Sequence, residues 1–211
     1  MTQDRFCALL RQYVRLDQPA LEARLLAVER RNVGLYGYGI KGFMLSMIET
    51  AIEISDGQIS AADIKSLLDF GHAMLQHPVE LIDGTRDVLH TLHARDHELW
   101  LVTKGDLFDQ ESKIARSGLG DFFSRVEILA EKDEPAYQRI LDRYGIAPDE
   151  FVMVGNSLRS DILPVVGLGA RAFYVPDPIT WAHETAPVQS EPQIAVTHLS
   201  SLRELTAHLG H

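Results

Sequence analysis

The run ELWLVTKGD (residues 98–106) is a short apolar segment that ends in a threonine, a lysine, a glycine and an aspartate. Segments of the same kind recur further along the chain, as RVEILA (125–130), FVMVG (151–155) and RAFYV (171–175). Helical patterns separate them, near residues 84–94, 107–117, 135–144 and 160–166. Apolar strands that alternate with helices are typical of a parallel sheet covered on both faces. The sequence therefore predicts an α/β fold with a Rossmann-like parallel sheet over residues 78–211.

Residues 1–77 show a different pattern and are expected to form a separate helical cap. Leucines at helical spacing mark residues 4–16 and 19–28, and Ser60–Asp63 resembles a capping box that opens a further helix. Residues 32–43 are rich in glycine and tyrosine, and we interpret them either as a loop or as a tight turn between helices. If this segment faces a pocket, Tyr38 and Lys41 are candidate substrate-binding residues.

Composition and charge exclude several classes of function. The 211 residues carry 20 Lys+Arg and 30 Asp+Glu, a net charge of −10, which disfavours binding to nucleic acid or to an anionic membrane surface. Cys7 is the only cysteine, so an intramolecular disulfide and a cysteine-based zinc site are excluded. No signal-peptide pattern or membrane-spanning run is present, and we expect a cytoplasmic protein. The oligomeric state is left open.

Polar residues follow the predicted strands, at the edge of the sheet where ligands bind in parallel α/β folds. Thr103 and Gly105 offer a hydroxyl and free backbone N–H groups, which suit a phosphate oxygen, and Lys104 lies between them. Lys132 supplies a positive charge for an anionic group. The third strand, residues 151–155, is followed by Asn156 and Asp161, two oxygen ligands of the kind that Mg²⁺ prefers. Each residue alone is common in turns and surface loops, but together they follow three successive strands.

The order of these motifs resembles the core of the haloacid dehalogenase-like (HAD) hydrolase superfamily. LVTKG (101–105) resembles the second motif, with Thr103 as the phosphate-binding hydroxyl, and Lys132 matches the lysine of the third. VGNSLRSD (154–161) resembles the acidic metal motif, with Asn156 in place of the usual first aspartate and Asp161 as the second. The resemblance implies Mg²⁺-dependent phosphoryl transfer through an aspartyl intermediate, or less often dehalogenation. Thr103 and Lys132 would then be catalytic.

One part of the HAD pattern is absent from the chain. The family opens with an apolar strand that ends in Asp-x-Asp, and its first aspartate is the nucleophile. No such pattern occurs in this sequence. In the family that strand lies in mid-sheet, between the strands that end here at Thr103 and Gly155, so we expect a slot there. The simplest hypothesis is that the chain starts late, and we expect these 211 residues to be inactive or nearly so.

The sequence thus predicts a HAD-type phosphatase that acts on a small phosphorylated metabolite and whose nucleophilic aspartate is absent. One alternative is a catalytically inactive binding or scaffolding remnant that keeps an anion pocket. Another is a 2-haloacid dehalogenase. We favour the phosphatase because dehalogenases usually carry an asparagine three residues before the last aspartate, where this chain has Leu158.

Overall fold

The computed structural model describes residues 2–176 and 196–210, which form two compact units. The first contains residues 2–79 and 105–116, and the second contains the described residues of 80–104 and 117–211. The assignment of residues 1–77 to a cap and 78–211 to a core stays a prediction, because compactness does not assign a role. None of the helices in the described ranges is long and apolar enough to cross a bilayer.

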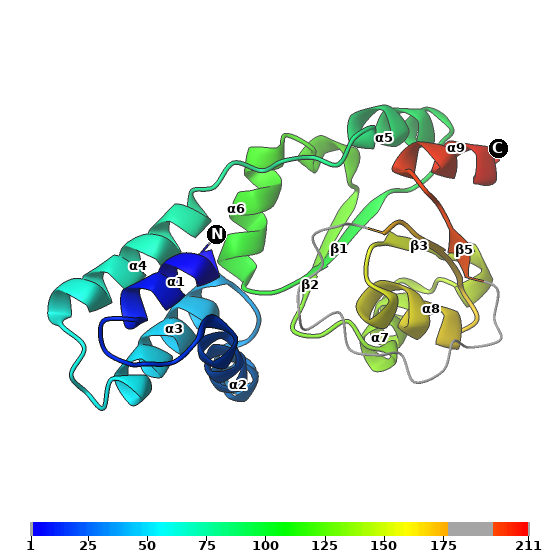
Figure 1. The fold of residues 1–211 in the computed structure, drawn as a ribbon. Helices are drawn as coiled ribbons and strands as arrows, with labels where there is room; N and C mark the ends of the chain where they lie inside the picture. The colour runs from blue at the N-terminus through cyan, green and yellow to red at the C-terminus, as the bar shows by residue number, and fades with distance from the viewer. Residues whose placement is uncertain (1, 177–195, 211) are drawn as a thin grey trace. The chain divides into compact units, whose positions relative to one another are not determined.

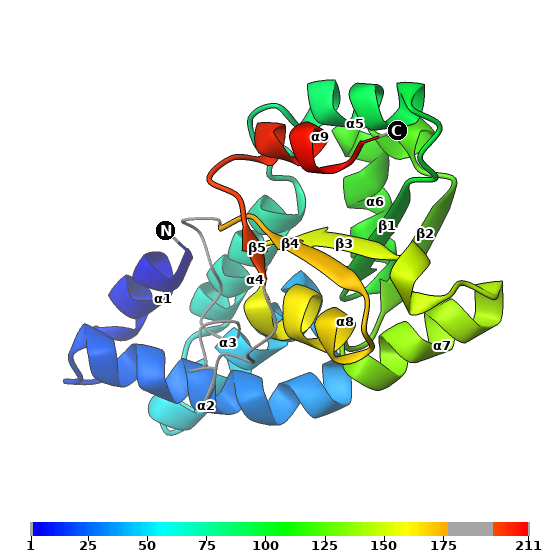
Figure 2. The same cartoon turned by 90° about the vertical axis from the view of Figure 1, so that its right-hand side faces the viewer.

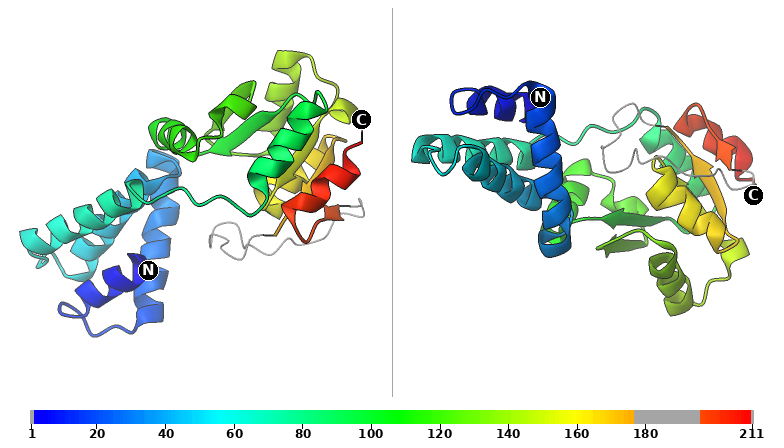
Figure 3. Two further views of the ribbon diagram at one scale, coloured as in Figure 1. Left: turned by 90° about the horizontal axis from the view of Figure 1, so that it is seen from above. Right: turned by 60° about the horizontal axis from the view of Figure 1, so that its bottom comes forward.

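The first unit is all-helical (Figures 1 and 3). Its helices are α1 (Thr2–Leu10), α2 (Gln18–Tyr36), α3 (Ile40–Ile54), α4 (Ala61–Leu75) and all but the last residue of α6 (Leu107–Ser117). The expected cap at Ser60 is present, because its hydroxyl accepts a hydrogen bond from the Asp63 amide at 3.0 Å. The apolar faces of α1 to α4 meet in one core of Phe6, Cys7, Leu10, Leu21, Leu25, Phe43, Met47, Ala51 and Leu67.

The segment 32–43 is a tight turn between two helices rather than a long loop. Helix α2 continues to Tyr36 and α3 begins at Ile40, so the connection is only three residues long. The helix extends this far because α3 holds its last turns: Asn32 Nδ2 donates to Ser46 Oγ at 3.2 Å, and Arg31 pairs with Glu49. The helix therefore extends well beyond residues 19–28, which the leucine spacing marks. Gly37 ends the helix with a φ of +71°, which glycine adopts without strain.

The second unit has the predicted α/β architecture. Its strands are β1 (Trp100–Lys104), β2 (Arg125–Leu129), β3 (Val152–Gly155), β4 (Arg171–Tyr174) and β5 (Thr197–His198). Its helices are α5 (Thr85–Ala94), α7 (Glu134–Tyr144), α8 (Leu163–Gly167) and α9 (Leu205–His208). All strand pairs are parallel, as the apolar runs predict.

The five strands form two sheets instead of one. β1 pairs with β2, and β3, β4 and β5 form a second sheet in that order (Figure 2). No strand among the described residues pairs with both β1 and β3. The interruption falls between the strands that end at Lys104 and Gly155, where the sequence predicts a slot. Val102 of β1 nevertheless packs against the apolar cluster that contains Met153 and Ile162, so both sheets share one core.

The chain makes a close turn after β3 that brings Asp161 back to the strand end. Residues Leu158–Ile162 form a single turn of π-helix, and regular α-helix begins only at Leu163. The Asp161 amide donates to the Ser157 carbonyl at 2.8 Å, and the Ser157 amide donates to Asp161 Oδ2 at 3.0 Å. A Cβ atom at Gly155 would lie 2.4 Å from the carboxylate of Asp161. Residue 155 must therefore be glycine for Asp161 to take this position.

We expect the Gly155→Ala variant to lose about 1–3 kcal/mol of unfolding free energy, because the added methyl group overlaps the Asp161 side chain. The measurement is urea denaturation followed by circular dichroism. Gly34→Ala in α2 is the matched control, since a Cβ there has no neighbour within 4 Å. That control is expected to gain up to about 1 kcal/mol from helix propensity. A Gly155→Ala protein as stable as the wild type would contradict the close approach.

Candidate active site

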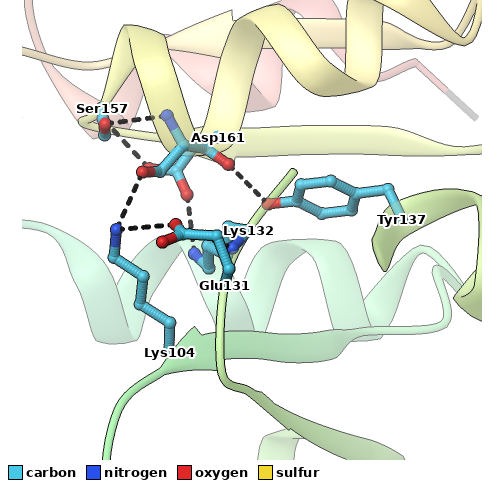
Figure 4. A network of polar contacts seen from close by, with 7 residues as sticks. Lys104, Glu131, Lys132, Tyr137, Ser157 and Asp161 are labelled. Carbon is cyan, nitrogen blue, oxygen red and sulfur yellow. Dashed lines mark hydrogen bonds and ion pairs between the residues drawn. The ribbon is translucent and has the colours of Figure 1, made fainter. Parts of the chain in front are cut away.

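A buried ion pair joins the segments that follow β2 and β3. Lys132 Nζ lies 2.6 Å from Asp161 Oδ1, and the two side chains are only 11% and 6% exposed (Figure 4). Lys132 immediately precedes Asp133, whose side chain caps α7 by accepting from the Ala136 amide at 2.9 Å. The cap fixes the backbone beside Lys132, and the π turn fixes Asp161. Two residues that are 29 positions apart in the chain thus meet.

Lys104 extends this ion pair into a network that also includes the end of β1. Its Nζ lies 3.1 Å from Ser160 Oγ and 3.2 Å from Glu131 Oε1 (Figure 4). Glu131 Oε1 also accepts from the Lys132 backbone amide at 3.2 Å. The network therefore connects the carboxyl ends of three successive strands, β1, β2 and β3. This is the edge at which parallel α/β folds bind ligands.

The charged groups of the network balance one another. Lys104 and Lys132 carry two positive charges, and Glu131 and Asp161 carry two negative charges when ionised. Because three of the four side chains are largely shielded from water, their electrostatic interactions are stronger than those of surface pairs. A phosphate group placed here would add negative charge that the four groups do not offset.

Asp161 and Asn156 are the predicted metal ligands, and their chemistry suits Mg²⁺. Asn156 directly follows β3 and is exposed, whereas Asp161 is buried. In the described ranges no cluster of three or more His, Cys, Asp or Glu side chains could hold a metal ion. Mg²⁺ commonly takes only one or two carboxylates and completes its octahedral shell with water and substrate phosphate. Both residue types thus suit a magnesium ion as part of a ligand set, and their assignment as metal ligands stays a prediction.

The other residues predicted on the β1 edge lie beside this network in the chain. Thr103 is the penultimate residue of β1, opposite Ile128 of β2. Gly105 follows Lys104 with a φ of +134°, and a Cβ there would lie 3.3 Å from the Tyr38 carbonyl oxygen. The backbone angle thus requires glycine here, and the α2–α3 turn leaves little room for a side chain.

Tyr38 and Lys41 belong to the first unit, where Lys41 has partners of its own. Lys41 Nζ lies 2.7 Å from Asp106 Oδ1 and 3.5 Å from Asp109 Oδ1, and 5.0 Å from the centre of the Phe108 ring. The hydrogen bond from Lys41 lowers the pKa of Asp106 and raises the pKa of Lys41 itself. The Lys41 ammonium is thus already held by two carboxylates, and its role in substrate binding stays a prediction.

Sequence reasoning missed several members of the network. Glu131, Ser157, Ser160 and Tyr137 were not among the predicted site residues. Glu131 and Ser160 directly precede Lys132 and Asp161, and this adjacency was the available signal. Tyr137 follows an ordinary apolar helix pattern, so nothing local distinguishes its hydroxyl from that of any core tyrosine.

Removal of one partner from the buried pair should be costly. We expect Lys132→Met to lower the unfolding free energy by about 3–5 kcal/mol, because Asp161 then keeps a buried charge without its lysine. Lys65→Met is the control: it breaks an exposed pair with Asp69 and should cost less than about 1 kcal/mol. Urea denaturation of both variants provides the comparison. Equal losses would show that Lys132 and Asp161 are not paired in the folded protein.

A second variant tests the Lys41 contacts. Lys41→Met should raise the pKa of Asp106 toward the ordinary aspartate value, since the largest cause of its depression is removed. The Asp106 contribution to stability is present above the pKa of the unfolded carboxyl and is lost as the pH falls through the lower folded value. Lys41→Met should therefore weaken the dependence of the unfolding free energy on pH in this acidic range. Carbon-13 NMR titration of the Asp106 carboxyl gives the pKa, with Lys65→Met as the unaffected control.

Comparisons with known proteins show the family of the chain. The model of the haloacid dehalogenase-like hydrolase family matches residues 8–167. A crystal structure of a haloacid dehalogenase-like family hydrolase from Xanthomonas campestris is 42% identical, with a TM-score of 0.83, over 98% of this chain and 81% of that one.

Two curated relatives are phosphatases by name. Glyceraldehyde 3-phosphate phosphatase of Methanothermobacter thermautotrophicus is 28% identical over 58% of this chain and 57% of its own length. N-acylneuraminate-9-phosphatase of Mus musculus is 30% identical over 64% of this chain and 54% of its own length. The chain thus spans about half the length of these curated relatives. Because the family match extends over most of its residues, the chain belongs to the haloacid dehalogenase-like hydrolases.

Proposed function

We propose that this chain carries the phosphate-binding and metal-binding groups of a Mg²⁺-dependent phosphatase. The observation that carries the proposal is the network of Lys104, Lys132 and Asp161, which gathers the ends of three strands. Two lysines and a hydroxyl from Thr103 are the donors that a phosphoryl group requires. The names of the curated relatives support a phosphatase.

The charge balance of the network supports a role for Mg²⁺. Glu131 and Asp161 already offset the two lysines, so an incoming phosphate needs a further positive charge. Asp161 and Asn156 would hold the ion, which when bound supplies charge to stabilise the transferring group. Lys132 and Lys104 orient the phosphate oxygens, and Gly105 lets the backbone approach them.

A covalent route needs a carboxylate nucleophile that the network does not contain. We propose that it comes from a strand that pairs between β1 and β3, where the sheet is interrupted among the described residues. Such a strand would end beside Thr103 and Gly155, within the reach of Lys132. The interruption equally favours the second candidate function, a protein that binds a phosphorylated ligand without turnover.

The proposed substrate is a small phosphorylated metabolite in the cytoplasm. The net charge of −10 disfavours nucleic acid and anionic membranes, and a single cysteine fits a reducing compartment. Leu158 occupies the position at which the dehalogenases carry an asparagine, so dehalogenation is the less favoured reaction. Tyr38 and Lys41 stay among the proposed substrate contacts as members of the glycine- and tyrosine-rich segment 32–43.

The test is hydrolysis of p-nitrophenyl phosphate with and without Mg²⁺. We expect the 211-residue chain to be inactive or nearly so, and an extended chain that begins with an apolar strand ending in Asp-x-Asp to gain Mg²⁺-dependent turnover. The same extension with Asn-x-Asn is the matched control and should stay inactive. An extended Asp-x-Asp chain that binds inorganic phosphate but does not turn over would favour the binding function. Turnover by the 211 residues alone, lost in Asp161→Ala, would refute the need for a further nucleophile.

A further inference from the structure

Three of the hydrogen bonds of Ser160 connect different parts of the second unit. Its side-chain oxygen accepts from Lys104 Nζ at 3.1 Å, and its backbone amide donates to Ser157 Oγ at 3.0 Å. Its carbonyl oxygen accepts from the hydroxyl of Tyr137 at 3.1 Å. Ser160 is only 3% exposed and directly precedes Asp161. The position of Ser160 therefore affects both Lys104 and Asp161.

Tyr137 is the most deeply buried of these partners. It is fully buried on α7, in the core cluster that contains Met153 and Ile162. Its ring lies 6.4 Å from that of Phe151, centre to centre. Because packing fixes the ring, the hydroxyl is presented to the Ser160 carbonyl in one place. Loss of a hydrogen-bond donor to a buried carbonyl lowers the stability of the folded protein.

We propose that Tyr137 is a positioning residue that acts through Ser160. Its hydroxyl holds the π turn so that Asp161 faces Lys132 and the Ser160 side chain faces Lys104. The hydroxyl of Tyr137 reaches this network through the Ser160 carbonyl oxygen, and the proposed role needs no contact with the phosphate. The effect on ligand binding rests on the proposed function, whereas the effect on the turn does not.

The experiment compares two variants that each remove one tyrosine hydroxyl from α7 in the full 211-residue chain. Tyr137→Phe removes the donor to Ser160. Tyr144→Phe is the control, because that hydroxyl donates to Glu127 Oε1 at 2.6 Å and lies outside the network. Two quantities are measured: hydrogen exchange of the Asp161 amide, which donates to the Ser157 carbonyl, and the dissociation constant of inorganic phosphate in the presence of Mg²⁺.

We expect Tyr137→Phe to speed exchange of the Asp161 amide about three- to tenfold and to raise the phosphate dissociation constant by a similar factor. Tyr144→Phe should leave the exchange rate and the dissociation constant within about twofold of the wild type, because its hydroxyl lies outside the network. Unchanged Asp161 exchange in a folded Tyr137→Phe protein would overturn the proposal, and so would equal changes in the two variants. If the wild type binds no phosphate, the proposed function fails, and the exchange rates still decide the role of Tyr137.

Discussion

The buried pair of Lys132 and Asp161 is the interaction on which the rest of the site depends. Each charge would be strongly destabilised in this shielded position without its partner, so the segments after β2 and β3 must stay together. The π turn and the glycine at position 155 allow the aspartate to approach its own strand. The helix cap at Asp133 holds the backbone next to the lysine. The π turn, the glycine and the helix cap are local features, and all three support the contact between Lys132 and Asp161.

Because the sheet is interrupted, side-chain contacts hold its two parts together. Adjacent strands of a parallel sheet are normally tied by backbone hydrogen bonds, but in the described part of the chain no strand pairing links β1 to β3. The connection is made instead by Val102 in the core and by the contacts of Lys104 and Lys132 with the turn after β3. The polar network therefore has a structural role in addition to the chemistry proposed for it.

The two units divide the predicted site residues between them. The second unit contains the network, with two lysines balanced by two carboxylates, and this balance is the physical reason to expect a bound cation with a phosphate ligand. The first unit contains Lys41, whose ammonium is held by Asp106 and Asp109. Lys41, a predicted substrate contact, thus belongs to a different unit of the chain from Lys104 and Lys132.

Sequence patterns alone identified the parallel strands, most of the helices, the order of the motifs and the residues Lys104, Lys132 and Asp161, because strand ends and helix caps are set by neighbours in the chain. The tertiary structure decided the rest. It showed that α2 continues to Tyr36, because α3 binds its last turns, and that Lys41 is paired. It also brought Glu131, Ser160 and Tyr137 into the network. These features depend on contacts between residues far apart in the chain, which no local periodicity records.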